Sequence, residues 1–112
     1  MAFRLRFFGG EHDGETYLVD EKRGVTLGRS PTNNIFVRDR NVSRVHAQVT
    51  VEKGECLITD LQSTNGTFVG GRKISEEALQ PGDEVRLGLT TFRLEQIDDS
   101  VADTDTKPLT PQ

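Results

Sequence analysis

Short runs in which apolar and polar residues alternate recur along almost the whole chain, and each run ends at a turn signal. In the first run Phe3, Leu5 and Phe7 alternate with Arg4 and Arg6, which is the period of a strand with one buried face. Glycine-containing turns separate this run from the next, and about ten such runs follow one another at intervals of roughly 8–12 residues. The sequence therefore predicts an all-β domain, either a sandwich or a barrel.

The expected strands are short segments between glycine-, proline- and asparagine-containing turns. They cover residues 3–7, 16–19, 25–27, 35–37, 47–51, 57–60, 67–69, 84–87 and 91–94. The pair Gly70-Gly71 predicts a two-residue hairpin turn, because glycine adopts the positive φ that such turns require. The only helical pattern, at residues 75–78, is too short to predict a helix. Strands and helices do not alternate along the sequence, so a doubly wound nucleotide-binding fold is not expected.

Length and composition fit one small domain followed by a polar tail. The 112 residues, 33% of them hydrophobic and none of them Trp, are enough for one modest core. After Ile97 the composition changes, since residues 98–112 contain four Asp and one Lys and have a net charge of −3. The sequence predicts a domain over residues 1–97 and an acidic, disordered tail or linker over residues 98–112.

Positive charge is concentrated in one part of a nearly neutral domain. Removing the tail's four Asp and one Lys from the totals leaves 13 basic and 14 acidic side chains in residues 1–97. Within residues 28–46 the only acidic residue is Asp39, and the basic ones are Arg29, Arg38, Arg40 and Arg44. This local excess predicts an anionic ligand at one site. It is too small for a general nucleic-acid surface, and no aromatic residues interleave with it for base stacking.

Three loops combine the residue types that suit a phosphate group. They contain Gly28-Arg29-Ser30, Ser43-Arg44-Val45-His46 and Ser63-Thr64-Asn65-Gly66-Thr67. Arginine offers a planar fork of donors, and hydroxyl and backbone N–H groups donate to phosphate oxygens. Each loop alone would also fit an ordinary turn. Their joint occurrence predicts a site that binds a phosphate group and does not cleave it.

We expect the loops at 28–34, 38–44 and 61–66 to meet at one end of the sandwich, because an even number of strands separates them. If the strand after residue 43 begins early, Ser43 and Val45 face one way, and Arg44 and His46 the other. For His46 a structural role, with its ring bonded to the loop backbone, is favoured over general-base catalysis. No nucleophile, base and carboxylate follow one another around it.

The sequence favours neither catalysis nor a metal site nor membrane insertion. Cys56 is the only cysteine and lies in an apolar run, so we expect a buried small hydrophobe. Two histidines and one cysteine make a poor metal-ligand set, and no P-loop or reactive-cysteine setting points to an enzyme such as a phosphatase. No apolar stretch approaches the roughly 20 residues that span a membrane, and no signal peptide is evident. We expect a cytoplasmic, non-enzymatic protein without a cofactor.

The order of these motifs resembles the forkhead-associated (FHA) domain, a family of phosphothreonine-peptide readers. The resemblance extends over most of residues 3–96 and implies a β-sandwich of about eleven strands with the ligand loops at one end. Gly70 stands where the family often has Asn. The matching positions are Gly28-Arg29-Ser30, Asn34-Ile35, Asp39, Val42-Ser43-Arg44, His46-Ala47, Asp60, Ser63-Thr64-Asn65-Gly66-Thr67, Gly71, Leu79, Gly82-Asp83, Leu87-Gly88 and Phe92.

The resemblance also implies roles for individual residues. Arg29 and Ser43 are expected to contact the phosphate, and Arg44 to reach the phosphate or the adjacent peptide. Thr64 is expected to contact the phosphate or the peptide backbone, and Asn65 the peptide main chain. Asn41 is expected to face the residue three positions after the phosphothreonine. The positions that support this site are Gly28, Ser30, His46 and Gly66.

The implied function is a phosphothreonine-dependent protein–protein interaction module in a Ser/Thr kinase pathway. Its partner would be a phosphorylated protein, such as the kinase or one of its substrates. A phosphorylation-independent interaction scaffold on the same fold is the alternative. The threonines Thr104, Thr106 and Thr110 raise the further hypothesis that the domain binds its own phosphorylated tail, although an ordinary linker also explains this segment.

Overall fold

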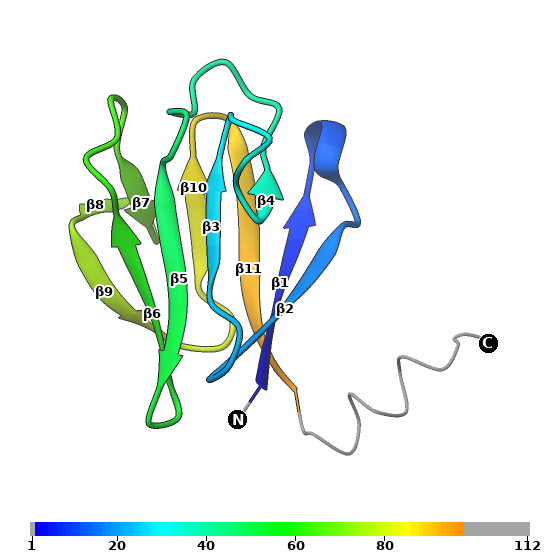
Figure 1. Ribbon diagram of the computed structural model, residues 1–112, viewed down its shortest axis with the longest axis vertical. Helices are drawn as coiled ribbons and strands as arrows, with labels where there is room; N and C mark the ends of the chain where they lie inside the picture. Colours follow the sequence, from blue (N-terminus) through cyan, green and yellow to red (C-terminus); the bar gives the residue numbers. More distant parts are fainter. Residues whose placement is uncertain (1, 98–112) are drawn as a thin grey trace.

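The computed structural model describes residues 2–97, which form two β-sheets packed face to face (Figure 1). The predicted tail and its three threonines lie outside the described residues. The elements are β1 (Ala2–Phe8), a 3-10 turn η1 (Gly10–His12), β2 (Thr16–Asp20), β3 (Val25–Gly28), β4 (Ile35–Phe36), β5 (Ala47–Glu52), β6 (Glu55–Asp60), β7 (Thr67–Val69), β8 (Arg72–Ile74), β9 (Glu76–Leu79), β10 (Glu84–Leu87) and β11 (Thr90–Ile97).

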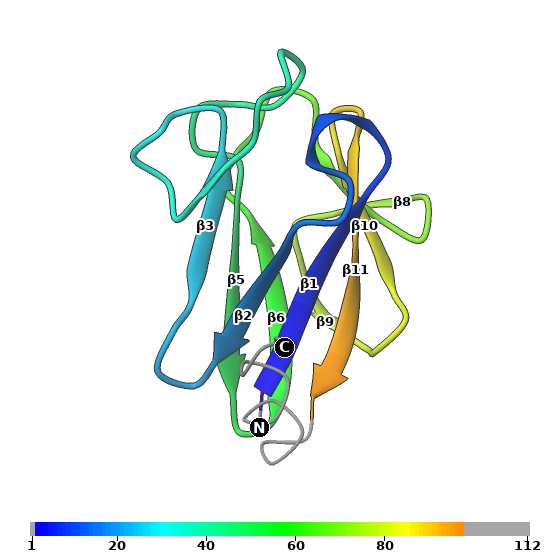
Figure 2. The ribbon, with the colours of Figure 1, turned by 90° about the vertical axis from the view of Figure 1, so that its right-hand side faces the viewer.

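The two sheets divide the strands almost equally. One has six strands in the order β2-β1-β11-β10-β7-β8, and the other has five in the order β4-β3-β5-β6-β9. Figure 2, turned by a right angle, shows the two layers with β3, β5 and β6 on one side and β1, β10 and β11 on the other. Every neighbouring pair is antiparallel except β3 and β4, which are parallel. The predicted all-β sandwich is confirmed.

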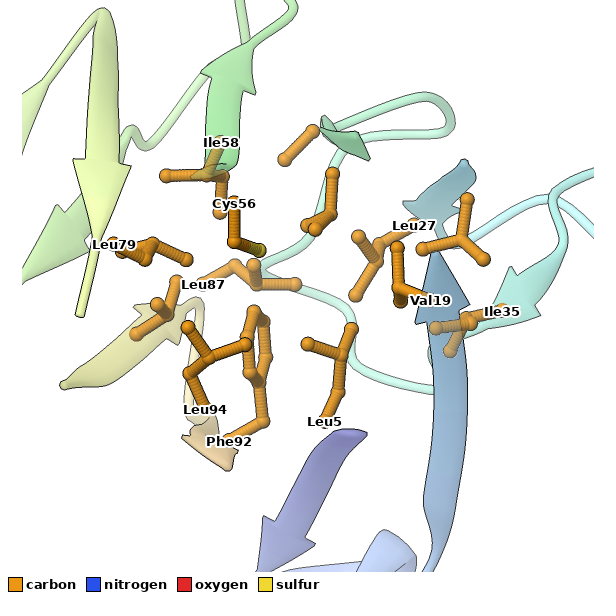
Figure 3. Packing of buried hydrophobic residues seen from close by; sticks show 14 of the residues in the cluster. Leu5, Val19, Leu27, Ile35, Cys56, Ile58, Leu79, Leu87, Phe92 and Leu94 are labelled. Atoms are coloured by element: carbon orange, nitrogen blue, oxygen red, sulfur yellow. The ribbon is translucent and has the colours of Figure 1, made fainter. Parts of the chain in front are cut away.

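The core between the sheets is built from the inward-facing residues of the alternating strands. In β1 the buried residues are Phe3, Leu5 and Phe7. In β11 Phe92 and Leu94 are fully buried and pack with residues of the opposite sheet (Figure 3). Burying apolar side chains of this size stabilises the fold by roughly 1.5–3 kcal/mol each. A shift of the register by one residue would move these side chains to solvent.

The region after β7 contains a hairpin that the sequence predicted and a strand, β9, that it did not. Gly70 and Gly71 have φ values of 57° and 84° and join β7 to β8 in a two-residue hairpin, as predicted. The segment 75–78, whose helical pattern was too short to predict a helix, lies in and before β9, which pairs with β6. Pairing along an open sheet edge overrides a weak local preference when the backbone gains a full ladder of hydrogen bonds.

Within residues 2–97 no helix has the length and apolar character needed to span a membrane.

Candidate functional site

Three connections converge at the end of the sandwich drawn uppermost in Figure 1, and they are the loops predicted from sequence. The expectation that an even number of strands separates them is wrong for the first pair, because β4 alone lies between residues 28–34 and 38–44. The segment 29–34 itself reverses the chain, so that β4 runs parallel to β3. The next loop therefore also begins at this end.

The converging loops enclose a pocket of about 150 Å³ that is lined by Arg29, Arg40, Asn41, Val42, Ser43, Thr64 and Asn65. The exposed Arg29 side chain is held by its Nε, which donates to the carbonyl oxygen of Val42 at 3.1 Å. Among residues 2–97 no carboxylate pairs with Arg29. Its two terminal amino groups therefore remain available as a planar pair of donors toward the pocket.

Hydrogen bonds between the loops set the positions of the other polar groups. The backbone N–H of Thr64 donates to Ser43 Oγ at 2.9 Å, so the Ser43 hydroxyl keeps its own proton to donate. The side-chain amide of Asn65 donates to the carbonyl of Asn41 at 2.9 Å. These two bonds join loops more than twenty residues apart. The pocket's donors are thereby held in one arrangement before any ligand is present.

Gly28 lies where the backbone at the end of β3 closely approaches the backbone of Arg44. A Cβ at this position would overlap the carbonyl oxygen of Arg44 and the side-chain amide of Asn33. That carbonyl accepts hydrogen bonds from the amide of Asn33 at 2.7 Å and from the N–H of Ser30 at 3.2 Å. The N–H of Arg29 donates to the carbonyl of Ser43 at 2.9 Å. A residue without a side chain is required for this contact.

His46 is fully buried and joins two of the loops. Its Nδ1 accepts a hydrogen bond from the N–H of Ser43 at 3.0 Å, and its Nε2 lies 2.9 Å from the carbonyl oxygen of Gly66. Because Nδ1 accepts, the proton of the neutral ring lies on Nε2 and is donated to Gly66. The predicted structural arrangement, a ring bonded to loop backbone, is what the structure shows.

The segment around Arg44 differs from the expected alternation. β5 begins at Ala47, and both Arg44 and Val45 are exposed. The Arg44 side chain does not line the pocket, and its carbonyl oxygen makes the loop contacts described above. Ser30 also lies outside the lining, where its hydroxyl is 2.9 Å from that of Thr32. Irregular backbone replaces the strand here because the loop must turn back toward Gly28.

Arg40 lines the pocket beside Arg29, although the sequence analysis counted it only within the basic segment. Its side chain is exposed, and no carboxylate within residues 2–97 pairs with it. The pocket lining thus contains two guanidinium groups and no acidic side chain. The signal that could have identified Arg40 was its place in the polar loop between Asp39 and Ser43.

Two carboxylates hold the ligand loops in position by accepting hydrogen bonds from them. Asp60 accepts hydrogen bonds from the hydroxyls of Ser63 at 2.5 Å and Thr67 at 2.7 Å and from the N–H of Ser63 at 3.2 Å. Asp39 accepts from the N–H groups of Asn41 at 2.9 Å and Leu89 at 2.7 Å. The first carboxylate shapes the 61–66 loop, and the second links the 38–44 loop to the turn before β11.

His12 is a further anchor of the ligand loops, and the sequence did not identify this role. Its Nε2 accepts a hydrogen bond from the N–H of Arg38 at 3.0 Å, and its Nδ1 lies 3.0 Å from the carboxylate of Glu15. The side chain, at the end of η1, is buried. No local signal could have identified this contact, because it joins the β1–β2 connection to the loop after β4.

Both anchoring carboxylates have a pKa below the usual value for Asp. Partial burial acts to raise the pKa of Asp39, but hydrogen bonds from Asn41, Thr90 and Leu89 outweigh burial and lower it. For Asp60 partial burial is again opposed and outweighed by the hydroxyl groups of Ser63 and Thr67. The folded form therefore favours both ionised carboxylates.

These lowered pKa values predict acid sensitivity. The stabilisation is fully present above the unfolded Asp pKa of about 3.9 and is lost as pH falls through the lower folded values. We expect the free energy of unfolding, measured by urea titration, to fall as the pH drops below about 4, because the unfolded chain then binds protons at these two carboxylates more readily than the folded domain does. Asp60→Asn should show a shallower fall. An equally steep decline in that variant would contradict this account.

Cys56 is fully buried, and burial raises the pKa of its thiol to about 12. The prediction of a buried, hydrophobe-like cysteine is confirmed. A thiol in this state supplies no thiolate near neutral pH, so it cannot serve as a nucleophile for phosphate chemistry.

The fold is a β-sandwich, and its end loops present arginine and hydroxyl donors around a small pocket. This combination defines a binding module whose site is formed by loops. A family model described as the FHA domain matches residues 25–88. The chain therefore belongs to the FHA domain family, as its motifs indicated.

Two curated relatives and one solved structure illustrate the similarity. The chain is 39% identical over 85 residues, 76% of its length, to an oxoglutarate dehydrogenase inhibitor from Corynebacterium efficiens, and covers 58% of that protein. It is also 39% identical over 85 residues, again 76% of its length, to the glycogen accumulation regulator GarA from Mycolicibacterium smegmatis, and covers 52% of it. The chain thus spans little more than half the length of these relatives.

The solved structure comes from a structural and functional analysis of phosphothreonine-dependent FHA domain interactions. It superposes with a TM-score of 0.79 and 30% sequence identity, covering 88% of this chain and 99% of that chain.

Proposed function

We propose that this protein is a phosphothreonine-dependent interaction module and that the pocket between its end loops receives the phosphate group. The observation that supports this most directly is that the Arg29 side chain is held in place but has no carboxylate partner among the described residues. Its Nε is bonded to the backbone of Val42, and its terminal amino groups have no carboxylate partner among the described residues. A cation held in this way is prepared for an anion that comes from outside the domain.

Other residues of the pocket supply further donors for a phosphate group. Ser43 offers a hydroxyl proton, because its oxygen already accepts a bond from Thr64. Arg40 adds a second guanidinium group at the pocket wall. A phosphothreonine has a charge of about −1.5 to −2 and three acceptor oxygens, so it can use all of these donors at once. Asn41 and Asn65 line both this pocket and a neighbouring hollow, which supports the proposal that they contact the peptide beside the phosphothreonine.

We propose binding without catalysis. The only thiol is buried and protonated, and His46 has both ring nitrogens engaged by loop backbone. The phosphate would therefore be held and not transferred. A cytoplasmic setting fits this role, since a lone buried thiol requires no oxidising compartment.

The partner would be a phosphorylated protein of a Ser/Thr kinase pathway, either a kinase or one of its substrates. Relatives named as an oxoglutarate dehydrogenase inhibitor and as a glycogen accumulation regulator suggest that this partner is an enzyme of metabolism or acts on one. The phosphorylation-independent scaffold remains the competing function, because the same fold also presents open sheet faces.

Binding to matched peptides separates these two functions. We expect a phosphothreonine peptide from an oriented library to bind the domain, and its unphosphorylated twin to bind at least a hundredfold more weakly, because charge-assisted hydrogen bonds to the phosphate are lost. A phosphoserine twin should bind about 5- to 100-fold more weakly, if a pocket receives the γ-methyl group. Isothermal titration calorimetry measures all three. Equal affinity for the phosphorylated and bare peptides would favour the scaffold.

A further inference from the structure

A row of three side chains crosses three adjacent strands on the outer face of the six-stranded sheet. Phe68 of β7 is paired in register with Arg86 of β10 on one side and with Lys73 of β8 on the other. The neighbours of Phe68 along its strand, Thr67 and Val69, are buried, so Phe68 and its two partners face outward. The guanidinium carbon of Arg86 lies 4.4 Å from the centroid of the Phe68 ring.

This row adjoins the loops of the proposed phosphate site. A Cβ at Gly66 would lie 2.9 Å from Lys73 Cε and 3.3 Å from the Phe68 ring, so both side chains pack against the last residue of the 61–66 loop. Arg86 lines a hollow of about 250 Å³ together with Asn41 and Asn65. The same two asparagines line the phosphate pocket. A peptide that leaves the pocket across them therefore reaches Arg86.

The charges of this row are not neutralised within the domain. Neither Arg86 nor Lys73 makes an ion pair with any carboxylate in the part of the chain that the structure describes. Glu84 lines a second shallow hollow with Phe68 and Arg86, but its carboxylate is bonded to Arg93 at 2.9 Å.

Elsewhere on the same face the cations are paired. Arg4 and Arg6 both donate to Glu95, at 2.8 and 2.9 Å. Arg86 and Lys73 on this face, by contrast, lie beside the ligand loops and have no carboxylate partner within residues 2–97. Arg86 Nη1 donates to the carbonyl oxygen of Gly88 at 3.1 Å. Stacking on Phe68 orients the guanidinium group and leaves its other N–H groups available to donate.

We propose that Lys73 and Arg86, on either side of Phe68, form a second subsite that binds carboxylate side chains of the same peptide that contains the phosphothreonine. This inference rests on the proposed phosphothreonine-binding function. The peptide would pass from the phosphate pocket over Asn41 and Asn65 and place an acidic side chain between the two cations. Partners with acidic residues on that flank would be selected over partners without them.

The test uses pairs of phosphothreonine peptides that differ only in a run of Glu or Gln on the N-terminal or the C-terminal flank. We expect the Glu peptide of one flank to bind about three- to tenfold more tightly than its Gln twin at physiological salt, as two exposed ion pairs would produce. In the double variant Lys73→Gln/Arg86→Gln this ratio should fall to about one.

A matched control separates the local subsite from the overall charge of the domain. The double variant Lys22→Gln/Arg23→Gln removes the same charge from the β2–β3 turn at the opposite end of the sandwich (Figure 1), and it should keep the wild-type ratio. No Glu preference on either flank, or a preference that survives Lys73→Gln/Arg86→Gln, would overturn the inference. Equal loss in both double variants would also overturn it.

Failure of the proposed function itself gives a different result. In that case phosphothreonine peptides with Gln flanks and with Glu flanks would each bind no better than the unphosphorylated peptide of the same sequence.

Discussion

Replacing Arg29 with Ala is expected to remove measurable phosphopeptide binding while the domain stays folded. The side chain is exposed, and its one hydrogen bond within the domain is to the carbonyl of Val42, so its loss leaves no buried charge or cavity. The ligand would lose a charge-assisted pair of donors. Truncating one member of a desolvated charge pair costs about 2–5 kcal/mol, which is a loss of roughly thirtyfold to several thousandfold in affinity.

Two further variants make this result specific. Arg29→Lys keeps the charge but loses the planar fork, and we expect intermediate affinity. Arg23→Ala removes an arginine from the β2–β3 turn, far from the loops, and should bind as the wild type does. Affinities come from calorimetry, and urea titration checks that each variant is folded. If Arg29→Ala bound the phosphopeptide with unchanged affinity, the assignment of the phosphate pocket would be wrong.

Gly28→Ala is expected to damage both stability and binding. The new methyl group would overlap the carbonyl oxygen of Arg44, which is backbone and is held by Asn33 and Ser30. The end of the 38–44 loop would have to move away from β3. Overpacking of this kind costs about 1–3 kcal/mol of unfolding free energy, and sometimes more. Because Arg29 and Ser43 are bonded to each other across the same contact, the phosphate donors would lose their arrangement.

Gly24→Ala is the matched control. A Cβ at Gly24 would lie 3.1 Å from the Thr50 side chain and 3.2 Å from the carbonyl of Val49, so a shift of a few tenths of an ångström accommodates it. This position is at the end of the sandwich opposite the ligand loops (Figure 1). We expect a smaller loss of stability and unchanged phosphopeptide affinity. Wild-type stability and binding in Gly28→Ala would show that the loop contact is not tight.

The regular strands and the chemistry of the pocket could be predicted from local patterns. The alternation of Phe3, Leu5 and Phe7 places one face of β1 in the core, and a period of two leaves no other arrangement that buries all three. Arginine and hydroxyl residues at three loops indicated an anion-binding site. β8 and β9 are short strands at the edges of the two sheets, and four of their seven residues are charged. Edge strands of this kind lack an alternating pattern, so their position depends on the strands they join.

The sequence by itself determined the all-β class, the glycine hairpin at 70–71, the burial of Cys56 and the residue types of the pocket. These depend on period, turn chemistry and burial, which act over a few residues. Tertiary structure alone decided that Arg40 lines the pocket, and that His12, Asp39 and Asp60 hold its loops. It also decided that Arg86 and Lys73 lie beside the site without carboxylate partners. Such contacts join segments distant along the chain, and no local pattern specifies which distant partner a polar side chain will meet.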